Sequence, residues 1–321
     1  MNNKIHVNNN GLPILFTSVG IPGSSKSTWL ENHKEEYNYT IHSSDAIRAE
    51  FGDINDQSKN SQVFETLHNR IKTDLLKGKN VAYDATNLSR RKRTHFLTNE
   101  LKNITCYKVC LLFATPWEVC CMNNFNRYRH VPIEVMVKMY KNFNTPWYTD
   151  GFDEIHIIWY NYDHLPGFEY NLEADLYKWK EISHDSPWHS LSIGDHMIKA
   201  AEYSIEKYGN NDTLLYSCLL HDCGKPYVKS WQNSKGEPTD IAHFYNHENC
   251  SAYMCLFYLK KLYPNWNDKK ILYISLLINL HMRHHTAWKS SDKAKEKDRR
   301  LFGDDTIKLL DQIYTCDLAA H

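Results

Sequence analysis

The sequence predicts an α/β domain with a parallel sheet, followed by an all-α domain. Up to about residue 160, short apolar runs typical of buried strands alternate with stretches of helical periodicity. From about residue 175 the periodicity is helical throughout. A chain of 321 residues is long enough for two domains, each with a core of its own. We therefore predict one domain over residues 1–165 and a second over residues 175–321.

The expected elements follow from these runs. The predicted strands are PILFTSVG (13–20), YTIHSS (39–44), VAYDAT (81–86), CYKVCLLF (106–113) and DEIHIIWY (153–160). Helices are expected between them over 63–76 and 93–102, so the sheet should be parallel with helices on both faces. Pro and Gly in NYDHLPGFEYN (161–171) indicate a linker. The later helices are expected over 195–208, 214–222, 248–263 and 269–285.

Composition excludes several classes of protein. No apolar run reaches the roughly 18 residues that a membrane helix needs, and the first residues, MNNKIHVNNNG, have no apolar core for a signal peptide. We therefore expect a cytosolic protein. Its nine cysteines show no disulfide-framework or zinc-ribbon spacing, which agrees with reduced thiols. A net charge of zero argues against a broad nucleic-acid-binding surface, although Arg90-Arg91-Lys92-Arg93 is a local basic patch.

The stretch GIPGSSKST (20–28) lies between a predicted strand and a predicted helix, and it nearly matches the phosphate-binding pattern G-x-x-x-x-G-K-[ST]. Backbone N–H groups of such a turn bind phosphate oxygens, the lysine adds a full charge, and the next hydroxyl can ligate Mg²⁺. Ser25 replaces the second glycine, and we expect reduced affinity at worst. The residues expected to bind ATP and Mg²⁺ are Gly20, Gly23, Ser24, Ser25, Lys26, Ser27, Thr28 and Asp84.

Three later stretches support this interpretation. SSDAIR (43–48) places Asp45 and Arg48 on one face of a helix start, and YDATN (83–87) ends a strand where open α/β sheets bind ligands. NRYRHVP (126–132) carries Arg127 and Arg129, either of which is suited to cover a transferring phosphate. A carboxylate beside the phosphate-binding turn, such as Asp45, can accept a hydroxyl proton as the new bond to phosphorus forms.

Residues 12–160 resemble the phage polynucleotide kinase family of 5′-hydroxyl kinases. The resemblance rests on the stretches GIPGSSKSTWL, D-x-x-R, DATNLSRRKR and TPWEVCCMNNFNRYRHVPIEVMVKMY. The resemblance implies that Asp45 is the general base, that Arg48 contacts the phosphate beside the acceptor nucleoside, and that Arg127 or Arg129 contacts the donor phosphates. It also implies that the basic residues 90–93 contact the substrate backbone.

Histidine and aspartate residues recur along the second half. The central pair is His221-Asp222 in LLHDCGKP, at the end of an apolar helix. Imidazoles and carboxylates on separate helices suit one or two divalent transition ions, with the shared carboxylate bridging them. The candidate metal ligands are His196, His221, Asp222, His247, His281 and Asp317, with His189, His284 and His285 as alternates.

This series resembles the HD phosphohydrolase superfamily over residues 184–321, and in particular the HD modules of tRNA nucleotidyltransferases and of bacterial end-healing proteins. The resemblance implies one metal at His196, His221, Asp222 and Asp317, with His247 and His281 completing a second. The metal would be Mn, Co, Ni, Fe or Zn. Lys225 would orient substrate phosphate, and a metal-bound hydroxide would attack phosphorus. In the known fusion the HD module comes first, whereas here it comes second.

Together the two resemblances imply an enzyme that heals broken RNA ends, tRNA among them. It would phosphorylate the 5′-hydroxyl with ATP and Mg²⁺ and remove the 2′,3′-end phosphate, and a separate ligase would seal the ends. Two alternatives remain: a nucleoside-type kinase fused to a nucleotidase, and a nucleotide-sensing module whose kinase has decayed at Ser25.

Overall fold

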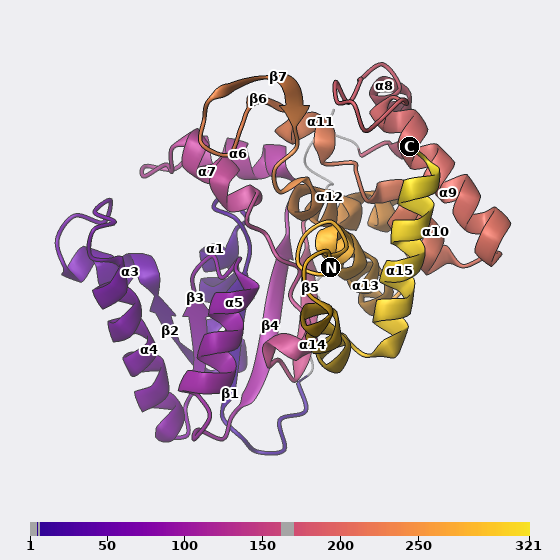
Figure 1. Ribbon diagram of the computed structural model, residues 1–321. Helices are drawn as coiled ribbons and strands as arrows, with labels where there is room; N and C mark the ends of the chain where they lie inside the picture. Colours follow the sequence, from indigo (N-terminus) through magenta and orange to yellow (C-terminus); the bar gives the residue numbers. More distant parts are fainter. Residues whose placement is uncertain (1–4, 6, 162–169) are drawn as a thin grey trace. The chain divides into compact units, whose positions relative to one another are not determined.

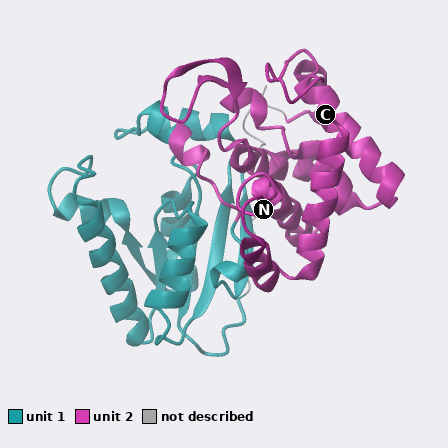
Figure 2. Cartoon of the chain, in the orientation of Figure 1, with its two compact units in different colours: residues 1–136, 146–161 teal, residues 137–145, 162–321 magenta. Residues whose placement is uncertain are grey.

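The computed structural model describes residues 5, 7–161 and 170–321. The chain forms two compact units, one made of residues 1–136 and 146–161 and the other of residues 137–145 and 162–321 (Figure 2). Most of the predicted linker at 161–171 lies outside the described residues. Among the described helices, none is both long enough and apolar enough to cross a membrane.

The first unit contains the predicted five-stranded sheet, in the order β2-β3-β1-β4-β5 (Figure 1). All four strand pairs are parallel, which confirms the prediction. The strands are β1 (Ile14–Val19), β2 (Tyr39–Ser43), β3 (Asn80–Asp84), β4 (Tyr107–Ala114) and β5 (Glu154–Trp159). Every residue of the central strand β1 is buried, as expected of a strand with neighbours on both sides and cover on both faces. Parallel strands end at one edge, so the residues after β1, β2 and β3 gather there.

Helices connect these strands. They are α1 (Lys26–Asn32), α2 (Lys34–Tyr37), α3 (Ser44–Glu50), α4 (Asn60–Leu76), α5 (Arg90–Thr94), α6 (Trp117–Phe125) and α7 (Ile133–Tyr140). In α4 the buried side chains recur every four residues, at Val63, Leu67, Ile71 and Leu75, so one stripe of the helix faces the core. The single helix predicted over 93–102 is wrong in detail: α5 is short and continues as a π-helical turn, His95–Glu100.

The second unit is mainly helical. Its helices are α8 (Leu172–Trp179), α9 (Ile193–Tyr208), α10 (Asp212–Leu220), α11 (Lys225–Val228), α12 (His247–Leu262), α13 (Asp268–Leu280), α14 (Asp292–Phe302) and α15 (Asp304–Ala319). The expectation of helix throughout is wrong at one place, where β6 (Ser230–Gln232) and β7 (Pro238–His243) form an antiparallel hairpin. Gly236, at a φ of +84°, occupies the left-handed region in the connecting turn.

Residues 137–145 belong to the second unit because they pack on α12 and α13. The ring of Phe143 meets the ring of Tyr253 nearly edge to face at 4.9 Å between centroids. The side-chain amide of Asn249 donates to the Lys141 carbonyl at 2.6 Å, and Thr145 Oγ1 lies 2.8 Å from Ser275 Oγ. These hydrogen bonds satisfy buried polar groups of the segment inside a largely apolar core.

Candidate phosphate and metal sites

The phosphate-binding turn follows β1 and ends at the start of α1. Gly23 has a φ of +84°, and a Cβ there would lie 2.1 Å from the Cys120 carbonyl oxygen, so no other residue fits without movement of α6. Ser25 also lies in the left-handed region, at a φ of 64°. That conformation is the one glycine adopts most readily, which explains why the pattern has glycine at this position. The serine therefore keeps the turn that a glycine would make.

Lys26 and Ser27 begin α1 and point to different partners. The buried ammonium of Lys26 donates to the Ile21 carbonyl at 2.9 Å, back across the turn. Burial lowers the pKa of Lys26, and the nearby Asp84 carboxylate opposes that shift. Ser27 Oγ donates to Asp84 Oδ2 at 2.7 Å, which joins the turn to the end of β3. A hydroxyl and a carboxylate at this spacing are the protein ligands that Mg²⁺ uses beside a nucleotide.

Asp45 and Arg48 lie on α3, directly after β2. Arg48 is buried and donates from Nη1 to Asp45 Oδ1 at 2.9 Å, whereas half of the Asp45 side chain is exposed. The other end of the Arg48 guanidinium donates to Asn60 Oδ1, at the start of α4, at 2.6 Å. The buried guanidinium thus fixes the carboxylate at the surface, where it can reach an incoming hydroxyl.

The two candidate arginines lie on the loop after α6, and they have different neighbours. Arg129 donates to Asp45 Oδ2 at 2.7 Å, to Asn55 Oδ1 at 2.9 Å and to the Ile54 carbonyl at 3.1 Å. Arg127 is close enough to Lys26 to lower the pKa of that lysine. Partial burial lowers the pKa of Arg127 as well. Arg129 therefore bonds Asp45 directly, whereas the charge of Arg127 acts on both Lys26 and Asp45.

The basic patch at 90–93 differs from the expectation that it contacts the substrate backbone. The Arg93 side chain is 1% exposed and donates to Asp150 Oδ2 at 2.7 Å and 2.9 Å. Arg90 Nε lies 3.2 Å from Asp150 Oδ1. Two guanidinium groups thus neutralise one fully buried carboxylate, which is a structural role. Only Arg91 and Lys92 remain exposed for contact with a substrate.

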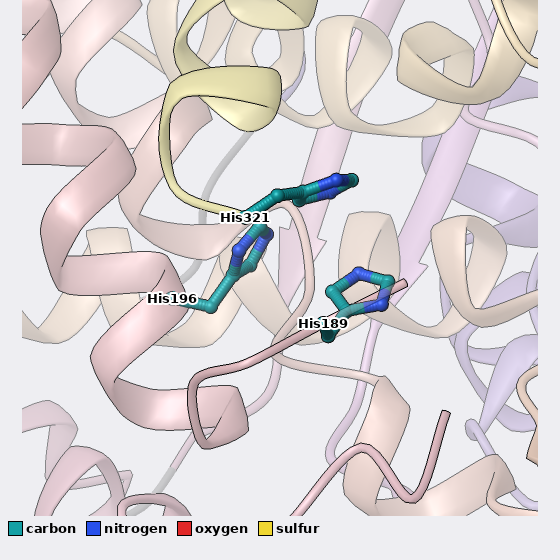
Figure 3. Close-up of side chains that lie close together, drawn as sticks. All are labelled: His189, His196 and His321. Atoms are coloured by element: carbon teal, nitrogen blue, oxygen red, sulfur yellow. The ribbon is translucent and has the colours of Figure 1, made fainter. Parts of the chain in front are cut away.

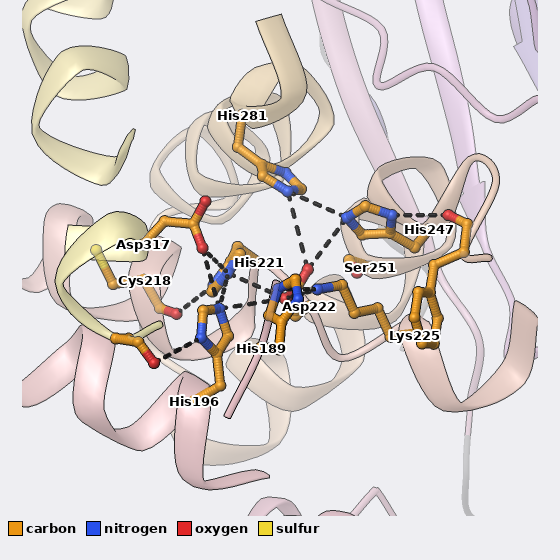
Figure 4. Close-up of polar contacts among 12 residues, drawn as sticks. His189, His196, Cys218, His221, Asp222, Lys225, His247, Ser251, His281 and Asp317 are labelled. Carbon is orange, nitrogen blue, oxygen red and sulfur yellow. Dashed lines mark hydrogen bonds and ion pairs between the residues drawn. The ribbon is translucent and has the colours of Figure 1, made fainter. Parts of the chain in front are cut away.

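The six candidate metal ligands of the second unit lie together at the ends of five helices (Figure 4). All of them are buried. Each of the four imidazoles has its Nδ1 within 3.2 Å of a backbone carbonyl oxygen, in the pairs His196–Ala320, His221–Cys218, His247–Phe244 and His281–Ile278. A carbonyl can only accept, so each Nδ1 carries a proton, and each Nε2 faces the centre, where it could bind a cation in place of a proton.

The Asp222 carboxylate lies between two groups of ligands. Its Oδ2 is 3.2 Å from His221 Nε2 and 3.4 Å from His196 Nε2. Its Oδ1 is 3.1 Å from His247 Nε2 and 3.9 Å from His281 Nε2. The structure therefore divides the ligands into two groups that share one carboxylate, the arrangement expected of a bridging ligand.

Asp317, on α15, completes the first group, with Oδ1 3.0 Å from His196 Nε2 and 3.5 Å from His221 Nε2. Burial opposes the charged form of His221, but Asp222 and Asp317 outweigh it and raise the pKa of His221 to about 10. The pKa of Asp222 is well below its usual range because His221 and Lys225 offset the burial of its charge. The carboxylates thus require positive charge beside them, which a proton or a metal ion can supply.

Of the two alternate metal ligands His284 and His285, only His285 lies beside the candidate metal ligands. His285 Nε2 lies 3.2 Å from Asp317 Oδ2, beside the first group of ligands. His284 Nε2 instead pairs with Asp311 at 2.8 Å, and its ring stacks on Tyr314. His284 therefore does not face the candidate metal ligands.

The edge of the metal site is formed by Lys225 and further histidines. Lys225 Nζ lies 2.6 Å from Asp222 Oδ2 and 3.4 Å from His189 Nε2, so the predicted phosphate-orienting lysine is adjacent to both. His189 also lies close to His196 and His321 (Figure 3). His321 was not predicted from the sequence, because nothing in the local pattern indicates that it reaches Asp317.

Comparison with known proteins concerns mainly the first unit. The family model described as an AAA domain matches residues 15–146, which is less than half of the chain. The first unit is a P-loop, kinase-like domain. Of the second unit, the match includes only residues 137–145, and a search of curated proteins gives no match.

Several solved structures are similar to part of the chain. The Pnkp1/Rnl/Hen1 RNA repair complex is 23% identical over 44% of this chain and 45% of that one, with a TM-score of 0.36. A second structure of the Pnkp1/Rnl/Hen1 complex is 25% identical over 38% and 40%, with a TM-score of 0.30. A fungal RNA kinase is 14% identical over 65% and 49%, with a TM-score of 0.37. The chain spans less than half the length of each of these structures.

Asparagines support the kinase-like site, and the sequence did not single them out. Asn123 donates to the Gly23 carbonyl at 2.9 Å and so joins α6 to the phosphate-binding turn. Asn124 bonds both the N–H and the carbonyl of Val131, at 2.9 Å and 2.8 Å, which closes the loop that carries the arginines. Asparagine is common in loops and helices, so only the long-range contacts distinguish these two.

Proposed function

We propose that the first unit is a 5′-hydroxyl kinase that acts on RNA ends. The observation that carries this proposal is the arrangement around Asp45, a half-exposed carboxylate positioned by buried Arg48 in the same unit as a complete phosphate-binding turn. The carboxylate would accept the proton of the attacking hydroxyl as the bond to the γ-phosphorus forms.

The donor side is formed by the turn itself. Backbone N–H groups of residues 23–27 and the Lys26 ammonium would bind the β- and γ-phosphates of ATP, and Ser27 and Asp84 would hold Mg²⁺. When bound, Mg²⁺ neutralises the charge that develops on the phosphate oxygens. Arg127, whose charge acts on Lys26, would add a further positive charge to the transferring phosphate.

We propose that the second unit is a metal-dependent phosphohydrolase of the HD type. Four imidazole Nε2 atoms and two carboxylates converge, with Lys225 at the edge, and this donor set fits divalent transition ions that would replace the proton of His221. One cation would be held by His196, His221 and Asp317, the other by His247 and His281, with Asp222 shared. Such cations supply a hydroxide at neutral pH.

The residues around this donor set would position the substrate. Lys225, beside Asp222, would bind a phosphate oxygen and align the phosphorus for attack. Each imidazole is oriented by its Nδ1 hydrogen bond to a carbonyl, which holds its Nε2 toward the proposed cation positions.

Both reactions are needed on the same kind of broken RNA. Cleavage that leaves a 2′,3′-cyclic phosphate and a 5′-hydroxyl produces two ends that must be converted before joining. We propose that this chain converts both, by phosphorylating the 5′ end and by hydrolysing and removing the phosphate at the 2′,3′ end. A separate ligase would join the products.

The test is direct. The protein is incubated with ATP and Mg²⁺, with either Mn²⁺ or Ni²⁺ added. The substrate is an RNA oligonucleotide with a 5′-hydroxyl and a 2′,3′-cyclic phosphate, and both ends of the product are analysed. We expect a 5′-phosphate and free 2′ and 3′ hydroxyls. Phosphorylation of nucleosides but not of the RNA would instead favour a nucleoside kinase, and ATP binding without transfer would favour a sensing module.

A further inference from the structure

Exposed aromatic side chains gather on three segments beside the metal site, residues 183–189, 225–232 and 242–247. Their side chains are between 42% and 64% exposed, and the four residues are Trp188, Tyr227, Trp231 and Tyr245. Single exposed rings are common, but a group of them on adjoining segments marks a surface that binds a substrate or a partner. The candidate metal ligands do not account for these rings.

The rings border the metal site because the same segments carry residues of that site. Trp188 directly precedes His189, whose Nε2 lies 3.4 Å from Lys225 Nζ on the second segment. Tyr245 comes two residues before His247, the candidate ligand that begins α12. The part of a substrate that extends beyond the metal site can therefore contact these rings.

The β6–β7 hairpin, which carries Trp231, is held to the first of these segments. The N–H of Ala242 on β7 donates to the Asp185 carbonyl at 3.0 Å. The ammonium of Lys229 donates to the Ser183 carbonyl at 2.7 Å and also pairs with the Asp185 carboxylate. The same ammonium lies over the Trp231 ring, 5.8 Å from its centroid. The Trp231 ring is therefore on the side of the hairpin that faces the segment leading to Trp188.

Flat rings beside a phosphate-binding lysine suit one kind of ligand. RNA held with its terminal phosphate at Lys225 would extend its last bases over the neighbouring surface. Every nucleobase has a flat face that stacks on tryptophan or tyrosine, and proteins commonly bind unpaired RNA in this way. A protein partner would be expected to meet aliphatic side chains as well, but the large apolar side chains exposed on these three segments are all aromatic.

We propose that Trp188, Trp231 and Tyr245 form a platform on which the last bases of an unpaired RNA 3′ end stack while its terminal phosphate lies in the metal site. Stacking uses the face of a base and not its edges, so the platform would bind any sequence. A base that is paired in a duplex cannot stack in this way without leaving its partner. This inference rests on the phosphohydrolase function proposed above and deepens it, because it names unpaired RNA 3′ ends as the substrate class.

The experiment compares two substrates of the full chain with Mn²⁺ or Ni²⁺, without ATP, so that only the cyclic phosphate reacts. One is a short single-stranded RNA that ends in a 2′,3′-cyclic phosphate, and the other is methyl ribofuranoside 2′,3′-cyclic phosphate, which has no base. The variants are Trp188→Ala, Trp231→Ala and Trp231→Phe. Tyr177→Ala is the matched control, because Tyr177 is an exposed ring on α8, outside the three segments.

We expect the wild type and Tyr177→Ala to have a much lower KM for the RNA than for the base-free substrate. Trp188→Ala and Trp231→Ala should each raise the KM for the RNA about tenfold with kcat unchanged, a size typical of the loss of one stacked base. Neither change should alter the kinetics of the base-free substrate, whereas damage to the metal site would. Trp231→Phe should keep most of the affinity, because an aromatic ring remains.

An unchanged KM for the RNA in both alanine variants would overturn the inference and leave the phosphohydrolase function standing, and a protein partner would then be favoured for this surface. Equal losses on the two substrates would also overturn it, because the rings would then support the metal site and not the bases. Hydrolysis of neither substrate by the wild type would overturn the proposed phosphohydrolase function itself, and the inference with it.

Discussion

Replacing Asp222 by asparagine tests whether the second unit binds metal as its geometry indicates. The change keeps the shape of the side chain but removes its charge. Each carboxylate oxygen faces a different pair of imidazoles, at 3.1–3.9 Å. The single substitution therefore weakens both candidate cation positions at once, because the bridging ligand no longer carries the charge that attracts two cations.

The magnitude follows from linkage between binding and folding. A cation present at 100 times its dissociation constant stabilises the folded state by about 2.7 kcal/mol. For a unit of this size, that free energy corresponds to a rise in Tm of roughly 5–10 °C. We expect the wild type to show such a rise when Mn²⁺ or Ni²⁺ is added to metal-free protein, and Asp222→Asn to show little or none.

The assay is thermal unfolding with and without metal, supported by metal analysis of the purified proteins. Each protein is compared with its own metal-free form, because loss of the carboxylate beside buried Lys225 lowers stability by itself. Asp311→Asn is the matched control: Asp311 pairs with His284 and Lys295 on the same unit, away from the candidate ligands. Equal metal-induced shifts in Asp222→Asn and wild type would refute the assignment of Asp222 as the shared ligand.

Further predictions concern the first unit. Ser25→Gly should keep or raise kinase activity and add up to about 1 kcal/mol to the free energy of unfolding, because glycine adopts the φ of 64° without strain. Inactivation by this change would show that the Ser25 hydroxyl has a role of its own. Gly23→Ala should abolish ATP binding, measured by calorimetry, since the added Cβ would lie 2.1 Å from the Cys120 carbonyl oxygen. Normal affinity for ATP would mean that α6 moves to make room for the methyl group. Asp45→Asn should lower kcat with the Kd for ATP unchanged, because an amide cannot accept the proton. A parallel loss of ATP affinity would move Asp45 to the donor side.

Local sequence patterns were sufficient for the parts of the fold that depend on local periodicity. The five strands, their parallel arrangement and the main helices of both units follow from apolar runs and their spacing. The β6–β7 hairpin was missed because its strands are short and Ala242 is their one buried residue, so they carry no apolar run. Its one signal is NSKGE (233–237), a turn sequence with glycine at the left-handed position.

Contacts between distant residues could not be predicted in this way. The basic run at 90–93 has the composition of a substrate-binding patch, but Asp150, 57 residues after Arg93, makes part of it structural. The sequence alone does not distinguish the roles of Arg127 and Arg129 for the same reason, because only the fold brings Arg129 to Asp45. The six predicted metal ligands do lie together, in two adjoining groups, because each is at or near the end of a helix of the second unit.

The central claim, that one chain carries two independent activities on RNA ends, is tested most directly by two variants and one substrate. Wild type, Lys26→Ala and Asp222→Asn are each incubated with ATP, metal and RNA bearing a 5′-hydroxyl and a 2′,3′-cyclic phosphate, and both ends are analysed. Lys26→Ala should abolish 5′ phosphorylation, through a barrier raised by about 3–4 kcal/mol, and leave removal of the 2′,3′ phosphate intact. Asp222→Asn should do the reverse. Loss of both activities in either variant while the protein remains folded would contradict the claim.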